Sequence, residues 1–371
     1  MKAFLKISRL VVGVLFIFSG LIKANDPLGL SYKMQEFFEV WGWSALNHYT
    51  LILSIVMIAF EIIAGVAVLL GWKMNLFSWL LLLLIIFFTF LTGYALFSGK
   101  IRECGCFGDC IPLEASQSFM KDIALLVLIL FIFPFRHTIK PLLNPAASIT
   151  ILLLATIFSL MFESHVLRHL PVVDCLPYKI GNNLLQKMKA PAGSVPDSTV
   201  ILFTYEKNGK QSSFTAENFP ADFDDAYKFV KREDKLVRKG TSTAAIRDFA
   251  LQTSSGADTT FELLNESGYK LFLFEKDEYQ TGSWEAMMNK ILDKAAEKNI
   301  KGFLITNLEI GRNSSIEKKF SLLTPLRADG TAIKTAARYN PTLFLLNNGT
   351  VVNKWSAPDL DKAFTSISQL K

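Results

Sequence analysis

The feature that most constrains the fold is the uneven distribution of apolar residues. Residues 1 to about 165 carry long runs of Leu, Ile, Val and Phe, whereas the rest of the chain has the composition of a soluble protein. The whole chain is 51% hydrophobic and contains 31 Phe, which is too apolar for a soluble globular protein of this length. The sequence therefore predicts a membrane region followed by an aqueous region.

Five segments approach the roughly 20 apolar residues that a membrane-spanning helix needs. They are residues 7–23, 50–71, 76–98, 121–135 and 147–163, of which the fourth is the shortest. The first follows Lys2, Lys6 and Arg9, as in a cleaved signal peptide. Because no small-residue cleavage site follows it and further spans do, we interpret it as an anchor.

Charge sets the predicted orientation, because Lys and Arg are retained on the cytoplasmic side. Lys2, Lys6 and Arg9 place the N-terminus in the cytoplasm, and with five spans Lys73 and the basic residues of 136–140 fall on the same side. The cysteine-containing loop before the fourth span and everything after residue 165 then lie in the periplasm, where disulfides persist. We expect a multi-pass protein of the inner (cytoplasmic) membrane. If the fourth segment did not span, the C-terminal region would be cytoplasmic.

The net charge of +6 does not indicate a nucleic-acid partner. The Lys and Arg residues stand at the ends of apolar runs or are scattered through the soluble part, and no phosphate-tracking patch is visible. The expected partners are the lipid bilayer and extracytoplasmic thiol proteins.

An amphipathic stretch, residues 28–42, stands in the first outer loop. Its apolar residues, at nearly helical spacing, are Leu30, Met34, Phe37, Phe38 and Trp41. Two interpretations stay open: the stretch lies along the outer membrane interface, or it caps the bundle over a cavity.

Three of the four cysteines lie in the loop ECGCFGDC, residues 103–110. They are Cys104, Cys106 and Cys110, and Gly105 and Gly108 permit a tight backbone around them. A disulfide between Cys104 and Cys106 would close a small strained ring, which is easily reduced. The loop is therefore a candidate catalytic site for disulfide exchange.

The fourth cysteine, Cys175, follows the last span on the same predicted side of the membrane. Four cysteines allow three full pairings, and the sequence does not choose among them. Cys175 either resolves a mixed disulfide or is a solitary buried thiol. The set as a whole is a structural staple, a redox centre or a thiolate metal site; it lacks the paired Cys-x-x-Cys motifs of a zinc ribbon, so we assign no metal.

Glu61 lies near the middle of the second span, where a carboxylate needs a partner or a proton. Lys23 and Arg9, at opposite ends of the first span, are the candidate partners because long side chains snorkel. Structurally, Glu61 would fasten two helices. Functionally, it would receive a proton when a quinone in the bundle, the expected cofactor, accepts electrons from the loop thiols.

Three motifs of the membrane region together resemble a known family. They are RLVVGVLFIFSGLIKANDPLG in the first span, Glu61 followed by GVAVLLGW, and CGCFG after the third span. They are similar to the DoxX-like superfamily, particularly its MauE branch, over residues 1–140. The resemblance implies a four-helix core, with residues 141–170 as a fifth linking helix, and thiol oxidation outside the membrane.

The whole chain resembles the fused DoxX-family membrane proteins of Bacteroidetes. In that family the position of Cys175 is commonly another residue, which weakens the claim of Cys175 to an essential role. MauE is associated with methylamine utilisation, but we do not carry methylamine over because no methylamine dehydrogenase subunit is present in the chain.

The region after the spans reads as two parts. Residues 171–264 are expected to be a β-rich linker subdomain, with a hairpin at Asn208-Gly209. In residues 265–371, a strand (269–276), a helix (283–299) and a strand (301–307) imply a parallel crossover. A hairpin within 340–355 and a terminal helix follow, and this order resembles the thioredoxin-like fold.

The thioredoxin-like domain lacks the motif on which its relatives depend. A Cys-x-x-Cys should open the helix at residues 279–282, where YQTG stands. Pro341 occupies the place of the cis proline that faces the active cysteines in thioredoxins, so we expect it to contact a substrate. The domain cannot perform dithiol exchange alone, and binding is the remaining role.

Two hypotheses follow. The first is a membrane thiol-disulfide oxidoreductase, or maturation factor for extracytoplasmic proteins, that uses Cys104, Cys106, Cys110 and Cys175. The second is a noncatalytic membrane scaffold with structural disulfides.

Overall fold

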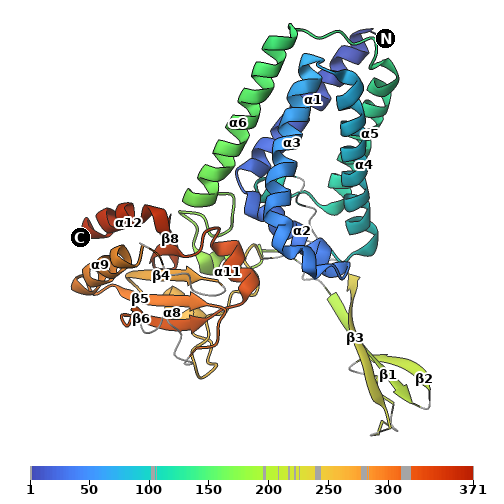
Figure 1. Ribbon diagram of the computed structural model, residues 1–371. Helices are drawn as coiled ribbons and strands as arrows, with labels where there is room; N and C mark the ends of the chain where they lie inside the picture. Colours follow the sequence, from blue (N-terminus) through green and yellow to red (C-terminus); the bar gives the residue numbers. More distant parts are fainter. Residues whose placement is uncertain are drawn as a thin grey trace.

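Figure 1 shows the computed structural model, in which a helical bundle carries an α/β domain at one end and a small sheet stands apart. The structure describes all residues except 1, 102–104, 106, 195–197, 208, 216–217, 221–222, 225, 239–243, 277–281, 283, 311–318 and 371.

The bundle consists of the five long apolar helices that the sequence predicts. They are α1 (Lys2–Ala24), α3 (Thr50–Leu70), α4 (Met74–Ser98), α5 (Ala115–Ile132) and α6 (Pro145–His169). Within the described part of the chain, these five are long and apolar enough to cross a membrane. The chain is a multi-pass membrane protein. α5 begins at Ala115, six residues before the predicted segment 121–135, so the fourth helix begins earlier than the apolar pattern indicated.

Glycine brings α1 and α3 close together. A Cβ atom built on Gly65 of α3 would lie only 2.8 Å from the carbonyl oxygen of Gly13 in α1. Small residues at such crossings let backbones approach, which matters in lipid because no hydrophobic effect drives helices together. This crossing sets α3, with Glu61, directly against α1.

The amphipathic stretch forms α2 (Pro27–Val40), which follows α1 after a short turn. Asp26 caps it by accepting the Gly29 N–H at 3.0 Å, and Pro27 occupies the first helical position, where a missing N–H is harmless. Its apolar face turns inward, and Phe37 is only 5% exposed. The structure therefore supports the second interpretation, a helix that caps the bundle. A 3-10 turn, Ser44–Tyr49, leads on to α3.

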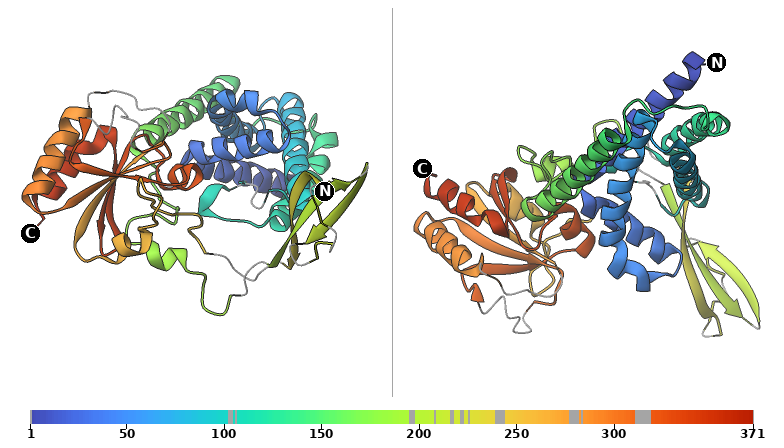
Figure 2. Two further views of the ribbon diagram at one scale, coloured as in Figure 1. Left: turned by 90° about the horizontal axis from the view of Figure 1, so that it is seen from below. Right: turned by 45° about the horizontal axis from the view of Figure 1, so that its top comes forward.

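A small antiparallel sheet stands apart from the α/β domain in both views of Figure 2. Its strands are β1 (Ser198–Lys207), β2 (Lys210–Thr215) and β3 (Lys228–Arg238), in the order β2-β1-β3. The predicted hairpin between β1 and β2 is present. β3 was not predicted, because KFVKREDKLVR is dominated by charge and shows no clean apolar alternation.

The α/β domain is built on a five-stranded mixed sheet in the order β6-β5-β4-β7-β8. Its elements are β4 (Tyr269–Glu275), α9 (Trp284–Glu297), β5 (Lys301–Thr306), β6 (Leu323–Arg327), α11 (Gly330–Ala336), β7 (Thr342–Asn347), β8 (Thr350–Ser356) and α12 (Leu360–Ser368). β4, β5 and β6 are parallel, and β7 and β8 are antiparallel to their neighbours. This is a thioredoxin-like domain, and the predicted crossover and hairpin are confirmed.

Both faces of this sheet are covered, because side chains alternate along β4. Leu271 and Leu273 pack with α9 and α12 on one face. Phe272 and Phe274 pack on the other face with α11 and with chain that precedes the sheet. That preceding chain includes α7 (Leu184–Met188) and α8 (Thr260–Asn265). Parts of the expected linker region 171–264 thus belong to this core, and the sheet β1–β3 is the part that stands apart.

Candidate functional site

The thiol loop connects α4 to α5 at the end of the bundle that meets the α/β domain. Cys104 and Cys106 lie outside the described residues. Gly105 and Gly108 both have positive φ, 66° and 55°, a conformation that glycine adopts without steric cost. The Gly108 N–H donates to the Gly105 carbonyl at 3.0 Å. The described part of the loop is therefore a tight turn, as its glycines indicated.

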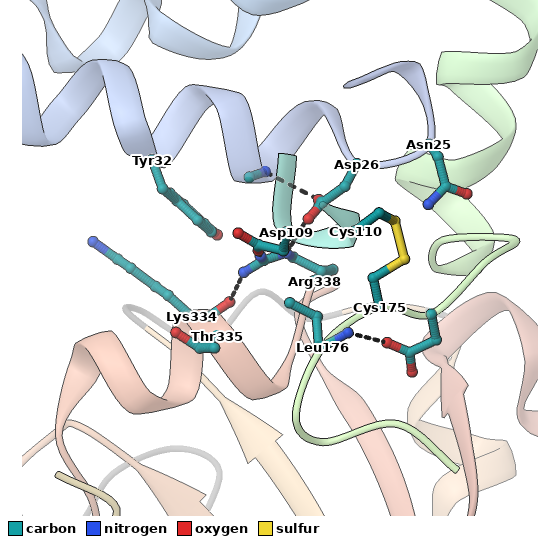
Figure 3. Close-up of polar contacts among 12 residues, drawn as sticks. Asn25, Asp26, Tyr32, Asp109, Cys110, Cys175, Leu176, Lys334, Thr335 and Arg338 are labelled. Carbon is teal, nitrogen blue, oxygen red and sulfur yellow. Dashed lines mark hydrogen bonds and ion pairs between the residues drawn. A yellow bond between two sulfur atoms is a disulfide. The ribbon is translucent and has the colours of Figure 1, made fainter. Parts of the chain in front are cut away.

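Cys110 and Cys175 form a disulfide, with Cα atoms 4.7 Å apart (Figure 3). The bridge ties the thiol loop to the segment that leaves α6, 65 residues further along the chain. This bridge shows that the alternative of a solitary Cys175 thiol is wrong. The sequence could not decide the point, because it does not show that the loop folds back to the exit of the last span. Cys175 belongs to the same cluster as the loop.

The bridge narrows the pairing of the other two cysteines. With Cys110 and Cys175 joined, only one of the three full pairings remains, so within one chain Cys104 and Cys106 pair with each other or stay reduced. Gly105, which stands between them, lies against Lys33 of α2.

Arg338, between α11 and β7, joins the α/β domain to the bundle. Its Nε is 2.9 Å from Asp26 Oδ2 and its Nη2 is 2.6 Å from Asp109 Oδ2, as Figure 3 shows. The Arg338 side chain is 6% exposed. Burial alone would lower the pKa of Arg338, but the charges of Asp26 and Asp109 outweigh it and raise the pKa. The guanidinium therefore stays charged and clamps the thiol loop to the start of α2.

The carboxyl end of β4 also faces α2. Lys276 bonds the hydroxyl of Tyr32. The Lys276 N–H donates to Asn340 Oδ1 at 3.0 Å, and Asn340 Nδ2 donates to the Lys276 carbonyl at 2.7 Å. Pro341, which is buried, follows Asn340 through a cis peptide bond. The edge of the sheet at which thioredoxins carry their dithiol therefore points at the bundle.

Three further contacts join the bundle's end to the α/β domain and its preceding segment. The pairs are Lys354 with Asp174, His169 Nδ1 with Asp359 Oδ2 (2.8 Å), and Asn25 with the backbone of Val173 (2.8 and 3.0 Å). Burial lowers the pKa of Lys354, and Asp174 opposes the shift. No cluster of three or more His, Cys, Asp or Glu in the described residues is arranged to hold a metal ion.

Inside the bundle, Glu61 pairs with Lys23, and the two side chains are 1% and 4% exposed. The Ser19 hydroxyl donates to the other Glu61 oxygen at 3.1 Å. Of the two candidate partners, Lys23 is therefore the one that reaches Glu61. Arg9 instead donates to the carbonyl oxygens of Val68 and Leu69 at 3.0 and 3.1 Å, at the C-terminal end of α3.

A second buried carboxylate, Asp122, stands at the start of the predicted fourth segment, residues 121–135. It lies within α5 and is 0% exposed, with Lys121 at 2.5 Å and the Thr92 hydroxyl at 3.1 Å. A small cavity of about 20 Å³ borders both acids and Lys23, and Phe107 of the thiol loop also lines it.

A larger cavity, about 220 Å³, lies between α2 and the bundle. Its lining is apolar apart from Lys23, Lys33 and Thr92, and Gly105 of the thiol loop forms part of its wall. Lys23 borders both cavities. The thiol loop, a buried ion pair and an apolar chamber thus meet at one end of the membrane region.

Two family models match parts of the chain. The family model described as methylamine utilisation protein MauE matches residues 1–135. Residues 1–135 form a MauE-like membrane domain. A second model, for a domain of unknown function named DUF8463, matches residues 199–239, the region of β1–β3. No curated protein matches the chain.

Two solved structures are similar to parts of the chain. One is a bacterioferritin comigratory protein of Xanthomonas campestris, studied for alkyl peroxide reduction: 16% identity, 33% of this chain, 92% of that chain, TM-score 0.26. The other is BsSco, of the Sco family of cytochrome c oxidase assembly proteins: 16% identity, 34% and 94% coverage, TM-score 0.24. Scores this low decide nothing about function, so the thioredoxin-like assignment rests on the order and direction of the strands.

Proposed function

We propose that this protein exchanges disulfides with extracytoplasmic thiol proteins, through Cys104 and Cys106, and passes the electrons to a quinone in the membrane. It resides in the inner membrane, with its N-terminus in the cytoplasm and its α/β domain in the periplasm. The orientation rests on Lys2, Lys6 and Arg9 at the N-terminus and on Lys73 between α3 and α4, because basic residues stay inside.

The observation that carries the proposal is the Cys110–Cys175 bridge. It supports separate roles for the two pairs of cysteines. Cys110 and Cys175 hold the loop in place, while Cys104 and Cys106, one residue apart, are left as the pair whose small ring is easily opened.

The exchange balances as follows. A substrate thiolate attacks the Cys104–Cys106 disulfide and forms a mixed disulfide, and a second substrate thiol then displaces the loop. The substrate loses two electrons and two protons, and Cys104 and Cys106 become thiols. Transfer of the two electrons and two protons to a quinone, which becomes a quinol, restores the loop disulfide.

The α/β domain serves as a clamp in this proposal. It has no thiol of its own in the Cys-x-x-Cys position. Its Arg338 holds Asp109 next to Cys110, and its Lys276 holds Tyr32 of α2. The domain thereby fixes the loop, and Pro341 lies at the same edge as the candidate contact for a substrate peptide.

The test is trapping in membranes that contain the full-length protein. The Cys106→Ser variant should lose oxidation of a model dithiol substrate. When the substrate is supplied in its disulfide form, the Cys104 thiolate should attack it, release one substrate thiol and remain in a mixed disulfide that Cys106 can no longer resolve. The control is Cys175→Ala, which removes the staple but leaves the exchanging pair and should retain part of the activity. Unchanged oxidation and no captured partner in Cys106→Ser would remove the basis for the proposal.

A second candidate function, a noncatalytic scaffold, is favoured by the number of fixed contacts around the loop. The bridge, the Arg338 clamp and the Lys354–Asp174 pair all hold the loop end of the bundle to the α/β domain. A scaffold requires no change in thiol state, so full oxidation of all four cysteines under every growth condition would favour it over exchange.

A further inference from the structure

The cavity beneath α2 has the features of a quinone site. We infer that it binds the ring of a membrane quinone, with Lys23 as the hydrogen-bond donor to a ring carbonyl. This inference rests on the proposed function and names the site at which its electron acceptor binds.

The size and the opening of the cavity fit one ring with a tail. Its volume of about 220 Å³ is below the roughly 300–1,000 Å³ of pockets that enclose drug-sized ligands. Leu53 of α3 and Phe87 of α4 line it and are 43% and 40% exposed. A ring could therefore enter from the lipid between α3 and α4, with its isoprenoid tail left in the bilayer.

The walls suit an aromatic ring and provide one oriented donor. Phe37, Phe38, Phe88 and Trp41 line the cavity, and aromatic side chains stack favourably on flat rings. Lys23 Nζ lies 4.5 Å from the centroid of the Phe88 ring. It is buried and paired with Glu61, so it is an oriented cation rather than a mobile surface charge.

In this proposal, the electrons come from the two cysteines that flank Gly105 in the sequence, and buried polar groups near Lys23 carry protons. Gly105 forms part of its wall, and its chain neighbours are Cys104 and Cys106. Behind Lys23, the small cavity is bordered by Glu61 and Asp122. A ring held there would take two electrons from the two thiols and two protons, one relayed through the Lys23–Glu61 pair. The products are the loop disulfide and a quinol, which leaves into the lipid.

The experiment measures saturable binding of tritiated decylubiquinone to the full-length protein in quinone-free lipid nanodiscs. Wild type should bind, and so should Cys106→Ser, because binding does not require the thiols. Leu91→Trp in α4 fills the cavity and should weaken binding at least tenfold. The matched control is Leu83→Trp on the same helix, whose side chain is 59% exposed; it should bind as wild type does.

A second cavity variant, Met34→Phe on α2, narrows the opposite wall and should also weaken binding if Leu91→Trp fails to fold. Non-saturable binding, or equal binding by wild type and both cavity variants, would overturn the site. Displacement of the label by decanol, which has the chain but no ring, would show an acyl-chain site and would equally overturn it. If wild type binds no quinone yet still oxidises thiols, the site is wrong and the proposed function stands.

Discussion

At the scale of single residues, Glu275 shows how one buried carboxyl group makes the stability of the α/β domain depend on pH. It ends β4, is 2% exposed, and its Oε2 has no hydrogen-bond partner among the described residues. Burial raises the pKa of Glu275 to about 7. Above about pH 4.5 the unfolded chain releases this proton, whereas the folded state still holds it. The contribution of Glu275 to the free energy of unfolding is therefore full below pH 4.5 and is lost as the pH rises through 7.

We predict that Glu275→Gln removes most of this pH dependence. Each pKa unit corresponds to about 1.4 kcal/mol, so wild type should lose on the order of 3 kcal/mol between pH 5 and pH 8 from this residue. Thermal unfolding of the full-length protein in detergent, at both pH values, measures the loss. Glu262→Gln, an exposed carboxyl in α8, is the control and should behave as wild type. A Glu275→Gln variant with the same pH dependence as wild type would contradict the prediction.

Some site residues could be predicted from sequence and others could not. Glu61 could, because an acid in the middle of a span requires a partner, and Lys23 was one of two within reach. Arg338 could not, because it stands in an ordinary polar segment and its partners Asp26 and Asp109 are 312 and 229 positions away. Asp122 was not singled out, because its burial depends on how α5 packs and the apolar pattern of the segment does not show this.

At the scale of elements, periodicity predicted the long helices, the crossover and the two hairpins. The strands β3 and β6 and the helix α11 carry weak signals: β3 is highly charged, β6 is five residues long and contains Pro325, and α11 has seven residues. Their positions depend on tertiary pairing, which a local pattern does not encode. The same limit applies to the Cys110–Cys175 bridge, which depends on where α6 ends relative to the thiol loop.

Arg338 pairs with both Asp26, which caps α2, and Asp109 of the thiol loop. We therefore predict that Arg338→Met loosens the α/β domain from the bundle. Removing one partner of a buried ion pair costs roughly 3–5 kcal/mol; we expect about 3, the lower end, because the Asp109 side chain is 33% exposed. Hydrogen–deuterium exchange of the full-length protein should become faster in α2 and in α11.

The matched control is Lys290→Met, which removes an exposed charge from α9, on the face of the sheet opposite α11. Its exchange in α2 should equal that of wild type. Unchanged exchange in Arg338→Met would mean that the remaining contacts hold the domain and that Arg338 is not the clamp.

At the scale of the whole molecule, the thiol loop, α2 and the α/β domain gather at one end of the membrane bundle (Figure 1). The contacts of Asp109 with Arg338 and of Cys110 with Cys175 show that they share one side. We propose from the charge pattern that this side faces the periplasm. In the function that we propose, the Cys110–Cys175 bridge and Arg338 fix the loop, and Cys104 and Cys106 exchange electrons with a quinone in the apolar cavity.

The most direct test of this account is differential alkylation and mass spectrometry of the four cysteines in native membranes. We predict that Cys110 and Cys175 are recovered as one bridge before and after mild reductant, while Cys104 and Cys106 are partly reduced and shift with the reductant. A bridge that joins Cys110 or Cys175 to Cys104 or Cys106, or a Cys104–Cys106 pair that never changes its thiol state, would contradict it.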